Sequence, residues 1–521
     1  MLNILPRPLE SDTDMWVDEA IWGHRLYDEQ TPWLCILEFL CIVQSEILAG
    51  KAFVEIEPNK LQYSSYLRLH LRNILFNNPH LEAIQAELPD DDARWNEWCN
   101  VMLKSSGGFA SPDFRYLRNR FSSFKDFVEV VKFLQSNSIE GDSNKRWSSK
   151  FVFPYGPHCL FEDLRVKGTE ASNDRRFFAR TGELLYLMLC RSNKGAEILS
   201  YLKKLRIVSD RNSDGNRGSK WEQLVAALQP DEDKSKTKAG KPPYLPYTHL
   251  PEYTKLADDW LNLLHCNLPE YDSLPHLVTV TGLHLIIYLL SRARVTLGQS
   301  EHPRFILEIV SSRKTVVRDL ASSSFLDNNN LSQQAVVARI RNLSLLPQWQ
   351  DCKTSRNPID SALSILYEQF AWPPKNQEDK IEGAGSPETL MDKLCDQAIT
   401  RHKQHLGRFH SSWTREIGLS SSRGSRRTRY APTDSLLKTL VLCSVYNRME
   451  FQDFLAELHR KYGFVIGERQ AGDIIASGNA DQEAFSDNAN RLERRLASIG
   501  LLKRLSDACA YVQNPFATEL S

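Results

Sequence analysis

The spacing of apolar residues along the chain predicts a mainly helical protein. Residues 14–139 carry apolar positions at helical spacing, and residues 33–48 are apolar nearly all round, as in a helix at the centre of a bundle. A second helical block covers residues 253–345, with a long helix near residues 278–295 as its spine. Within this block, FLDNNNLSQQ (325–334) combines turn residues with helix-start signals, so we expect one helix to end there and another to begin.

The C-terminal pattern, over residues 432–514, is typical of a winged helix. Thr433 and Asp434 are suited to cap a helix, while Gly463 and Gly500 are suited to end two later helices. The apolar residues of the last helix recur at i, i+4 and i+7, which predicts one buried stripe. The expected elements, in order, are a helix over 434–445, a helix over 451–462, a strand over 464–466, a helix over 485–499, and two strands over 501–505 and 508–512 that form the wing.

Changes in composition divide the chain, which at 521 residues is too long for a single core. The stretch QPDEDKSKTKAGKPP is charged, contains proline and lacks large apolar residues, which is typical of a linker or mobile loop. We expect an acidic helical bundle over 1–145, a mixed α/β segment over 146–228, a flexible linker over 229–243, a central helical domain over 244–372, an exposed connection over 373–388, a helix over 389–419, a basic linker over 420–430 and a winged-helix-like domain over 431–521. The predicted fold class is therefore mainly α: a multi-domain helical protein with a small strand-containing insertion and a C-terminal winged-helix-like domain.

Charge is unevenly distributed along the chain, although its formal net charge is zero. Residues 1–100 contain about 17 acidic and 7 basic side chains, whereas residues 401–521 contain about 13 acidic and 18 basic ones. An acidic N-terminal part and a basic C-terminal part suit a protein that meets a polyanion with one end only. Chance unevenness along a neutral chain is the alternative explanation.

The cysteines and the apolar runs indicate a cytoplasmic protein with no membrane partner. Ten cysteines occur without a CxxC pair, which is typical of a reduced compartment. The N-terminus, MLNILPRPLESDTD, lacks the basic and long apolar regions of a signal peptide. The best candidate for a membrane span, residues 278–290, is interrupted by threonine, glycine and histidine, so we interpret it as a buried core helix.

Motifs of the familiar enzyme classes are absent from the sequence. There is no GxxxxGK[ST] loop, HExxH, GxSxG, kinase signature set or Rossmann fingerprint, which favours a non-catalytic protein without a cofactor. The nearest candidates for a metal-dependent nuclease site are Glu162, Asp163 and Lys167, beside a strand-like stretch. Their spacing is not the usual acid-x-Lys, so a solvated strand end is the favoured interpretation.

His402, His405 and His410 form the densest group of histidines. No cysteine or close carboxylate completes a metal site, and the neighbouring arginines and lysine would repel a cation. We therefore expect no metal, and interpret this group as part of a basic helix face that contacts phosphate or a protein partner.

Basic residues in two regions are candidates for contact with DNA. The arginines of the linker lie among serines and glycine, in a flexible chain that cannot bury their charge, as in segments that follow a phosphate backbone. A solvated linker is the alternative. The arginines of the last helix lie off its apolar stripe, where a recognition helix presents donors to DNA, although Asp481, Glu483, Asp487 and Glu493 nearby would oppose phosphates. The candidate DNA-binding residues are Arg423, Arg426, Arg427 and Arg429 in the linker, Arg491, Arg494 and Arg495 on the helix, and Lys503 and Arg504 on the wing.

Two C-terminal stretches carry a resemblance to a known group of proteins. YAPTDSLLKTLVLCSVYNRMEFQDFLAELHRKYGFVIG and RLERRLASIGLLKRLSDACAYVQNP resemble the ends of proteins encoded in bacterial anti-phage defence islands, such as the methylation-associated defence system. The N-terminal DEAIWGHRLYDEQTPWLCILEFL is similar to the same group. The resemblance implies a non-catalytic or unassigned subunit of a defence complex that works beside helicases, nucleases or methyltransferases. It carries no functional residues over to this chain.

These features predict a non-catalytic DNA-binding adaptor or scaffold subunit of a bacterial anti-phage defence complex. The C-terminal winged helix and the basic linker would contact double-stranded DNA, and the acidic bundle would hold other defence-system subunits. Two alternatives stay open. One is a metal-dependent nuclease subunit whose site is assembled from residues distant in sequence, and the other is a protein-only scaffold.

Overall fold

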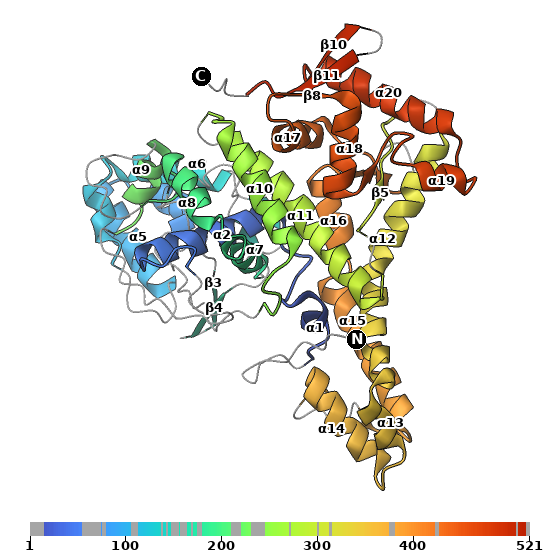
Figure 1. The fold of residues 1–521 in the computed structure, drawn as a ribbon. Helices are drawn as coiled ribbons and strands as arrows, with labels where there is room; N and C mark the ends of the chain where they lie inside the picture. Colours follow the sequence, from blue (N-terminus) through green and yellow to red (C-terminus); the bar gives the residue numbers. More distant parts are fainter. Residues whose placement is uncertain are drawn as a thin grey trace. The chain divides into compact units, whose positions relative to one another are not determined.

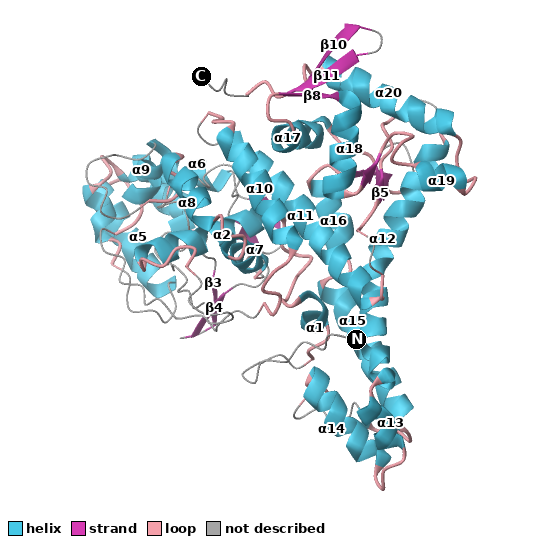
Figure 2. Cartoon of the chain, in the orientation of Figure 1, coloured by secondary structure: helices cyan, strands magenta, loops and turns pink. Residues whose placement is uncertain are grey.

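The computed structural model of the chain is mainly helical, which confirms the predicted fold class (Figure 2). Contacts within the chain define two compact units, one formed by Trp33–Pro243 and the other by Met1–Pro32 together with Tyr244–Ser521. The first unit is therefore inserted into the sequence of the second. The structure describes residues 15–54, 74–75, 80–105, 113–136, 139–141, 144–146, 156, 164–167, 170–173, 180–209, 220–230, 245–269, 272–299, 302–311, 315–374, 381–422, 427–506 and 509–516.

The unit Trp33–Pro243 is built from short helices around an aromatic core. Trp95 and Trp98 of α5 are buried against α6, where the ring centroids of Trp98 and Phe127 lie 4.8 Å apart. These tryptophans therefore fill the core, as the helical pattern indicates. The helices are α2 (Pro32–Leu48), α4 (Leu81–Glu87), α5 (Asp91–Ser105), η1 (Arg115–Asn119), α6 (Phe124–Ser136), α7 (Thr181–Cys190), α8 (Gly195–Lys204) and α9 (Lys220–Ala227). Two antiparallel hairpins pair β1 (Ile139–Gly141) with β2 (Asn144–Arg146) and β3 (Leu164–Lys167) with β4 (Glu170–Asn173).

The second unit is organised around α11 (Ser273–Thr296), which packs against α10 (Pro251–His265) and α12 (Val316–Arg341). By length and apolar composition α11 could cross a membrane, but 89% of its apolar window is buried inside the protein. Such burial is typical of a core helix and agrees with the prediction for this stretch. Other helices of this unit are α1 (Asp18–Trp22), η4 (Asn342–Leu345), α13 (Pro347–Lys353) and α14 (Pro358–Phe370).

The expected turn at residues 325–334 is wrong, because α12 runs through this stretch without interruption (Figure 1). Asn328 is buried there, and its Nδ2 donates hydrogen bonds to the backbone oxygen of Arg304 at 2.9 Å and to the Tyr430 hydroxyl at 3.0 Å. Asparagine has a low helix propensity in isolation. Tertiary hydrogen bonds compensate for it here, and no such bond is visible in the sequence.

Two helices and a small strand pair precede the C-terminal region. The helical stretch is divided at Gly407 into α15 (Pro387–His405) and α16 (Phe409–Glu416). The next segment forms an antiparallel pair, β6 (Ser420–Ser421) with β7 (Arg429–Tyr430). The end of the predicted basic linker is therefore a strand within the fold.

The C-terminal part of the second unit, residues 431–516, is termed the C-terminal domain; it contains the expected helices and strands, with β8 and α19 in addition. Thr433 Oγ1 accepts a hydrogen bond from the N–H of Leu436 at 3.3 Å, and Gly463 has a φ of 75° after α18, as predicted for a cap and a helix end. The elements are α17 (Asp434–Ser444), β8 (Arg448–Glu450), α18 (Phe451–Tyr462), β9 (Phe464–Val465), α19 (Gly472–Ala476), α20 (Gln482–Ser498), β10 (Leu502–Ser506) and β11 (Cys509–Gln513). Three of the strands form an antiparallel sheet in the order β10-β11-β8.

Candidate nucleic-acid interface

Helix α20 has one face packed in the core and one face turned to solvent. Its buried residues are Phe485, Asn488, Ala489, Leu492 and Leu496. Arg491, Arg494 and Arg495 lie off this stripe; Arg494 is exposed, and the other two are partly exposed. The apolar spacing therefore predicted correctly which side of α20 is buried.

Acidic side chains already neutralise two of these arginines. Arg491 Nη2 lies 3.3 Å from Asp487 Oδ2, one helical turn away. Arg495 Nε lies 2.6 Å from Asp434 Oδ1, which connects α20 to the start of α17. Arg494 forms no ion pair with another described residue, and its whole guanidinium group can meet an anion.

The two basic residues of β10 point to opposite faces of the sheet. Side chains alternate along a strand, so the neighbours Lys503 and Arg504 cannot both lie on the side of α20. Arg504 lies on that side, with its Nε 3.0 Å and its Nη2 2.7 Å from Glu493 Oε1. Lys503 is exposed on the other face. Of these two predicted DNA contacts, only Arg504 therefore lies on the side of the sheet that faces α20, and DNA binding by either residue stays a prediction.

Of the two linker arginines that the structure describes, one is buried and one is exposed. Arg429 was expected in a solvated chain, but it lies in β7, is only 2% exposed and forms an ion pair with Glu308. That expectation is wrong, because a buried carboxylate provides a partner that the sequence does not reveal. Arg427 is exposed, whereas Arg423 and Arg426 lie outside the described residues.

A segment between α11 and α12, residues 302–311, completes the C-terminal domain and is termed the clasp segment. It contains β5 (Phe305–Ile306), which pairs in parallel with β9. Asn488 of α20 holds the same segment: its Nδ2 donates to the Leu307 backbone oxygen at 2.9 Å, and its Oδ1 accepts from the Ile309 N–H at 2.8 Å. The C-terminal domain is therefore continuous in space with the central helices.

Glu308, in the middle of the clasp segment, is fully buried. Its carboxylate pairs with Arg429 and lies 2.8 Å from Arg318 Nε of α12, while its N–H donates to the Tyr430 backbone oxygen at 3.0 Å. A carboxylate buried between two arginines is tolerated only where both partners are in place. The clasp segment, α12 and β7 are thus fixed in one arrangement.

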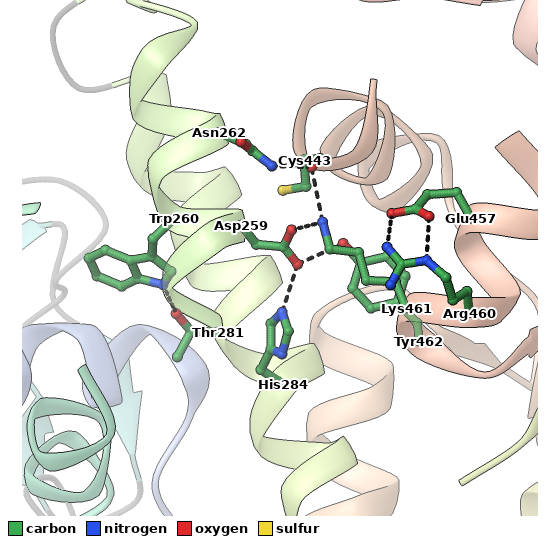
Figure 3. Close-up of polar contacts among 10 residues, drawn as sticks. All are labelled: Asp259, Trp260, Asn262, Thr281, His284, Cys443, Glu457, Arg460, Lys461 and Tyr462. Carbon is green, nitrogen blue, oxygen red and sulfur yellow. Dashed lines mark hydrogen bonds and ion pairs between the residues drawn. The ribbon is translucent and has the colours of Figure 1, made fainter. Parts of the chain in front are cut away.

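A second buried cluster joins α18 to α10 and α11 (Figure 3). Asp259 Oδ2 accepts hydrogen bonds from His284 Nε2 and from the Tyr462 hydroxyl, each at 2.7 Å, and Lys461 forms an ion pair with Oδ1. Burial alone would raise the pKa of Asp259, but His284 and Lys461 hold it below its ordinary value. Lys461 Nζ also donates to the Cys443 backbone oxygen at 3.1 Å, which ties α17 to the cluster.

The histidine group is not a basic surface. His402 and His410 are buried, and His402 Nε2 lies 3.1 Å from Ser332 Oγ. His410 Nε2 lies 2.7 Å from the Tyr430 hydroxyl, and burial lowers the pKa of His410 to about 3. Because both side chains are buried, the expected phosphate-binding face does not include these two residues; His405 is exposed. Among the residues that the structure describes, no group of three or more His, Cys, Asp or Glu side chains is placed to hold a metal.

Two of the three nuclease candidates, Glu162 and Asp163, lie outside the described residues. Lys167 is the last residue of β3. The nuclease alternative therefore stays a prediction.

Sequence reasoning missed the residues that attach the C-terminal domain to the central helices, namely Asp259, Glu308 and Asn488. The signal for Asn488 was present, because it falls three residues after Phe485 and four before Leu492, inside the apolar stripe. A polar residue at such a position has a buried partner in most folds. No comparable signal marks Glu308, since its partners come from distant segments.

Comparison with known proteins finds a family match for the C-terminal part of the chain. Residues 388–514 match the family model of the methylation-associated defense system protein MAD7. The matched region covers the two C-terminal stretches that resemble defence-island proteins, to within one residue at the end, so the C-terminal resemblance is confirmed. The N-terminal stretch lies outside the match, and its resemblance stays a prediction. No curated protein and no solved structure matches the chain.

Proposed function

We propose that the chain is a non-catalytic, DNA-binding adaptor subunit of a bacterial anti-phage defence complex that acts in the cytoplasm. In this proposal the C-terminal domain is a winged helix, with α20 as the helix that meets double-stranded DNA and the β10–β11 hairpin as its wing. Its other partners are further subunits of the defence system. The match of residues 388–514 to a methylation-associated defense system protein supports the defence role.

The observation that supports DNA binding is the outward face of α20. It carries an exposed arginine, while the opposite face of the helix is packed in the core. Arg494 is exposed, and Arg504 forms an ion pair with Glu493, the residue that precedes Arg494 on α20. The element order and the sheet order β10-β11-β8 suit a helix-turn-helix unit of α18 and α20 followed by a wing. Guanidinium groups in this position can contact phosphates or base edges in the major groove.

The attachment of the C-terminal domain supports the adaptor role. Glu308 and Asp259 fix the domain on the central helices through buried charges. Because the C-terminal domain is fixed in this way, DNA bound to it would be held in a defined position relative to the rest of the unit. It also means that α20 cannot be tested on a fragment that begins at residue 420, because the clasp segment would be missing.

A protein-only scaffold is the second candidate, favoured by the ion pairs of the α20 face. Arg491, Arg495 and Arg504 each have a carboxylate partner within 3.3 Å. A surface of alternating charges is suited to a protein partner as well as to DNA, because both signs can be matched across an interface.

Binding of the full chain to a labelled DNA duplex, followed by fluorescence anisotropy at low salt, tests the proposal. We expect micromolar or tighter binding that weakens about tenfold in Arg494→Glu, since a charge reversal removes an attraction and adds a repulsion. Arg356→Glu is the matched control, because Arg356 is an exposed arginine between α13 and α14, away from α20. Absence of duplex binding at low salt, together with co-purification of neighbouring gene products, would favour the scaffold.

A further inference from the structure

The antiparallel sheet of the C-terminal domain has one face against the helices and one face turned away from them. Leu502 and Val512 are cross-strand partners, and both are buried. The next row across the sheet therefore points outward, because side chains alternate along each strand. This row consists of Lys503 on β10, Tyr511 on β11 and Glu450 on β8, aligned by the strand register.

A tyrosine ring and two cations lie together on the outward face. Tyr511 is on the central strand, and Arg448 Cζ of β8 lies 5.7 Å from the centre of its ring. Lys503 stands directly opposite Tyr511 on the other side. Arg448 and Lys503 are exposed, and Tyr511 is partly exposed. The face thus combines aromatic surface with positive charge, and Glu450 is the one carboxylate of the row.

Two further aromatic side chains are exposed at one end of this sheet. Tyr446, two residues before β8 begins, is 64% exposed, and Phe516, shortly after β11 ends, is 45% exposed. Because β8 and β11 are antiparallel, the beginning of one lies beside the end of the other, and the Asn514 N–H donates to the Asn447 backbone oxygen at 2.9 Å. Exposed rings of this size at the end of a sheet that carries cations are typical of a surface that a partner covers.

We propose that this stacking face, defined by Arg448, Lys503 and Tyr511 with Tyr446 and Phe516 at its end, binds single-stranded DNA. Unpaired bases present flat faces that stack on aromatic rings and guanidinium groups, and the phosphates between them meet the two cations. A duplex does not fit this chemistry, since its bases are stacked on one another inside the helix. The inference rests on the proposed DNA-binding function and adds a second binding surface on the opposite side of the sheet from Arg504.

Two ligands and two variants of the full chain separate the surfaces. Anisotropy is measured with labelled oligothymidylate, which forms no duplex, and with a labelled blunt duplex. Tyr511→Thr removes the ring and keeps a residue that favours strands. We expect it to weaken oligothymidylate binding about tenfold, the loss typical of one stacked base, and to leave duplex affinity within about twofold. Arg494→Glu is expected to weaken duplex binding about tenfold and to leave oligothymidylate affinity within about twofold.

Photocrosslinking of the wild-type chain supplies a readout that does not depend on a variant's fold. An oligonucleotide that contains 5-iodouracil crosslinks to an aromatic residue on which the base stacks, and mass spectrometry is expected to map the adduct to Tyr511. Equal oligothymidylate affinity of wild type and Tyr511→Thr, or adducts found only outside the stacking face, would overturn the inference. Absence of duplex binding by the wild-type chain, with oligothymidylate binding retained, would instead count against the proposed role of α20.

Discussion

The core of the unit Trp33–Pro243 and the attachment of the C-terminal domain are built from opposite kinds of contact. The first is a cluster of apolar side chains around Trp98. The second buries the carboxylates of Asp259 and Glu308 among lysine, histidine and arginine partners. Apolar packing is non-directional, whereas a buried charge is stable only where its partners meet it. The difference indicates that the contacts of Asp259 and Glu308 hold the C-terminal domain in a defined orientation.

Breaking the Asp259 cluster should have the largest effect. Asp259→Ala leaves Lys461 buried without its counterion, and we expect the free energy of unfolding to fall by about 4 kcal/mol. Urea denaturation followed by circular dichroism measures the loss. The double variant Asp259→Leu with Lys461→Met removes both charges and should lose much less. A double variant as unstable as the single one would show that the pair itself provides the stability.

Removing apolar surface from the core of the unit Trp33–Pro243 should have the next largest effect. Leu117 is fully buried, and Leu117→Ala should lower the free energy of unfolding by about 3 kcal/mol through lost burial and a cavity. Duplex affinity measured at a temperature where the variant is folded should not change, because no charged contact of the C-terminal domain is involved. A large loss of duplex affinity would mean that the two regions are coupled.

Acid should lower the free energy of unfolding through His410 before carboxylates are protonated. The pKa of His410 is lowered by burial to about 3, so the unfolded state, with an ordinary value of 6.5, binds the proton first. This contribution to stability is complete above pH 6.5 and is lost as the pH falls toward 3, with a loss of about 2 kcal/mol at pH 5. The difference in unfolding free energy between pH 7 and pH 5 should shrink by that amount in His410→Gln. An unchanged difference would place the acid sensitivity elsewhere.

Releasing an arginine beside α20 from its ion pair should have the smallest effect, a modest increase in duplex affinity. Glu493→Gln frees Arg504 from its ion pair and should strengthen duplex binding about twofold to fivefold, in keeping with the modest energy of an exposed pair. The unfolding free energy should change little. The matched control is Asp392→Asn, which frees Arg341 of α12 in the same way and should leave duplex affinity as it is. Weaker binding in Glu493→Gln would contradict the proposed contact of this face with DNA.

Much of the C-terminal domain could be predicted from sequence because its signals are local. Thr433 caps a helix, Gly463 ends one, and the apolar stripe from Phe485 to Leu496 defines which side of α20 is buried. Each feature depends on residues within a few positions of one another. The same local signals identified the arginines that face solvent on α20.

The rest could not be predicted because it depends on contacts between distant segments. The sequence around Asn328 resembles a turn, and only bonds to Arg304 and Tyr430 explain why it stays helical. Arg429 resembles its neighbours in a basic linker, but Glu308 lies 121 positions away in the chain and buries it. Only the strand register determines on which side of the sheet Lys503 and Arg504 lie.

The salt dependence of duplex binding tests the central claim most directly, namely that the outward face of α20 contacts the DNA backbone. The association constant of the wild-type chain, of Arg494→Gln and of Arg356→Gln is measured by anisotropy from low to physiological salt. Each phosphate contact contributes about 0.9 to the slope of log K against log salt concentration, so Arg494→Gln should lower the slope by about that amount. Arg356→Gln should keep the wild-type slope. Equal slopes for all three proteins would contradict the account.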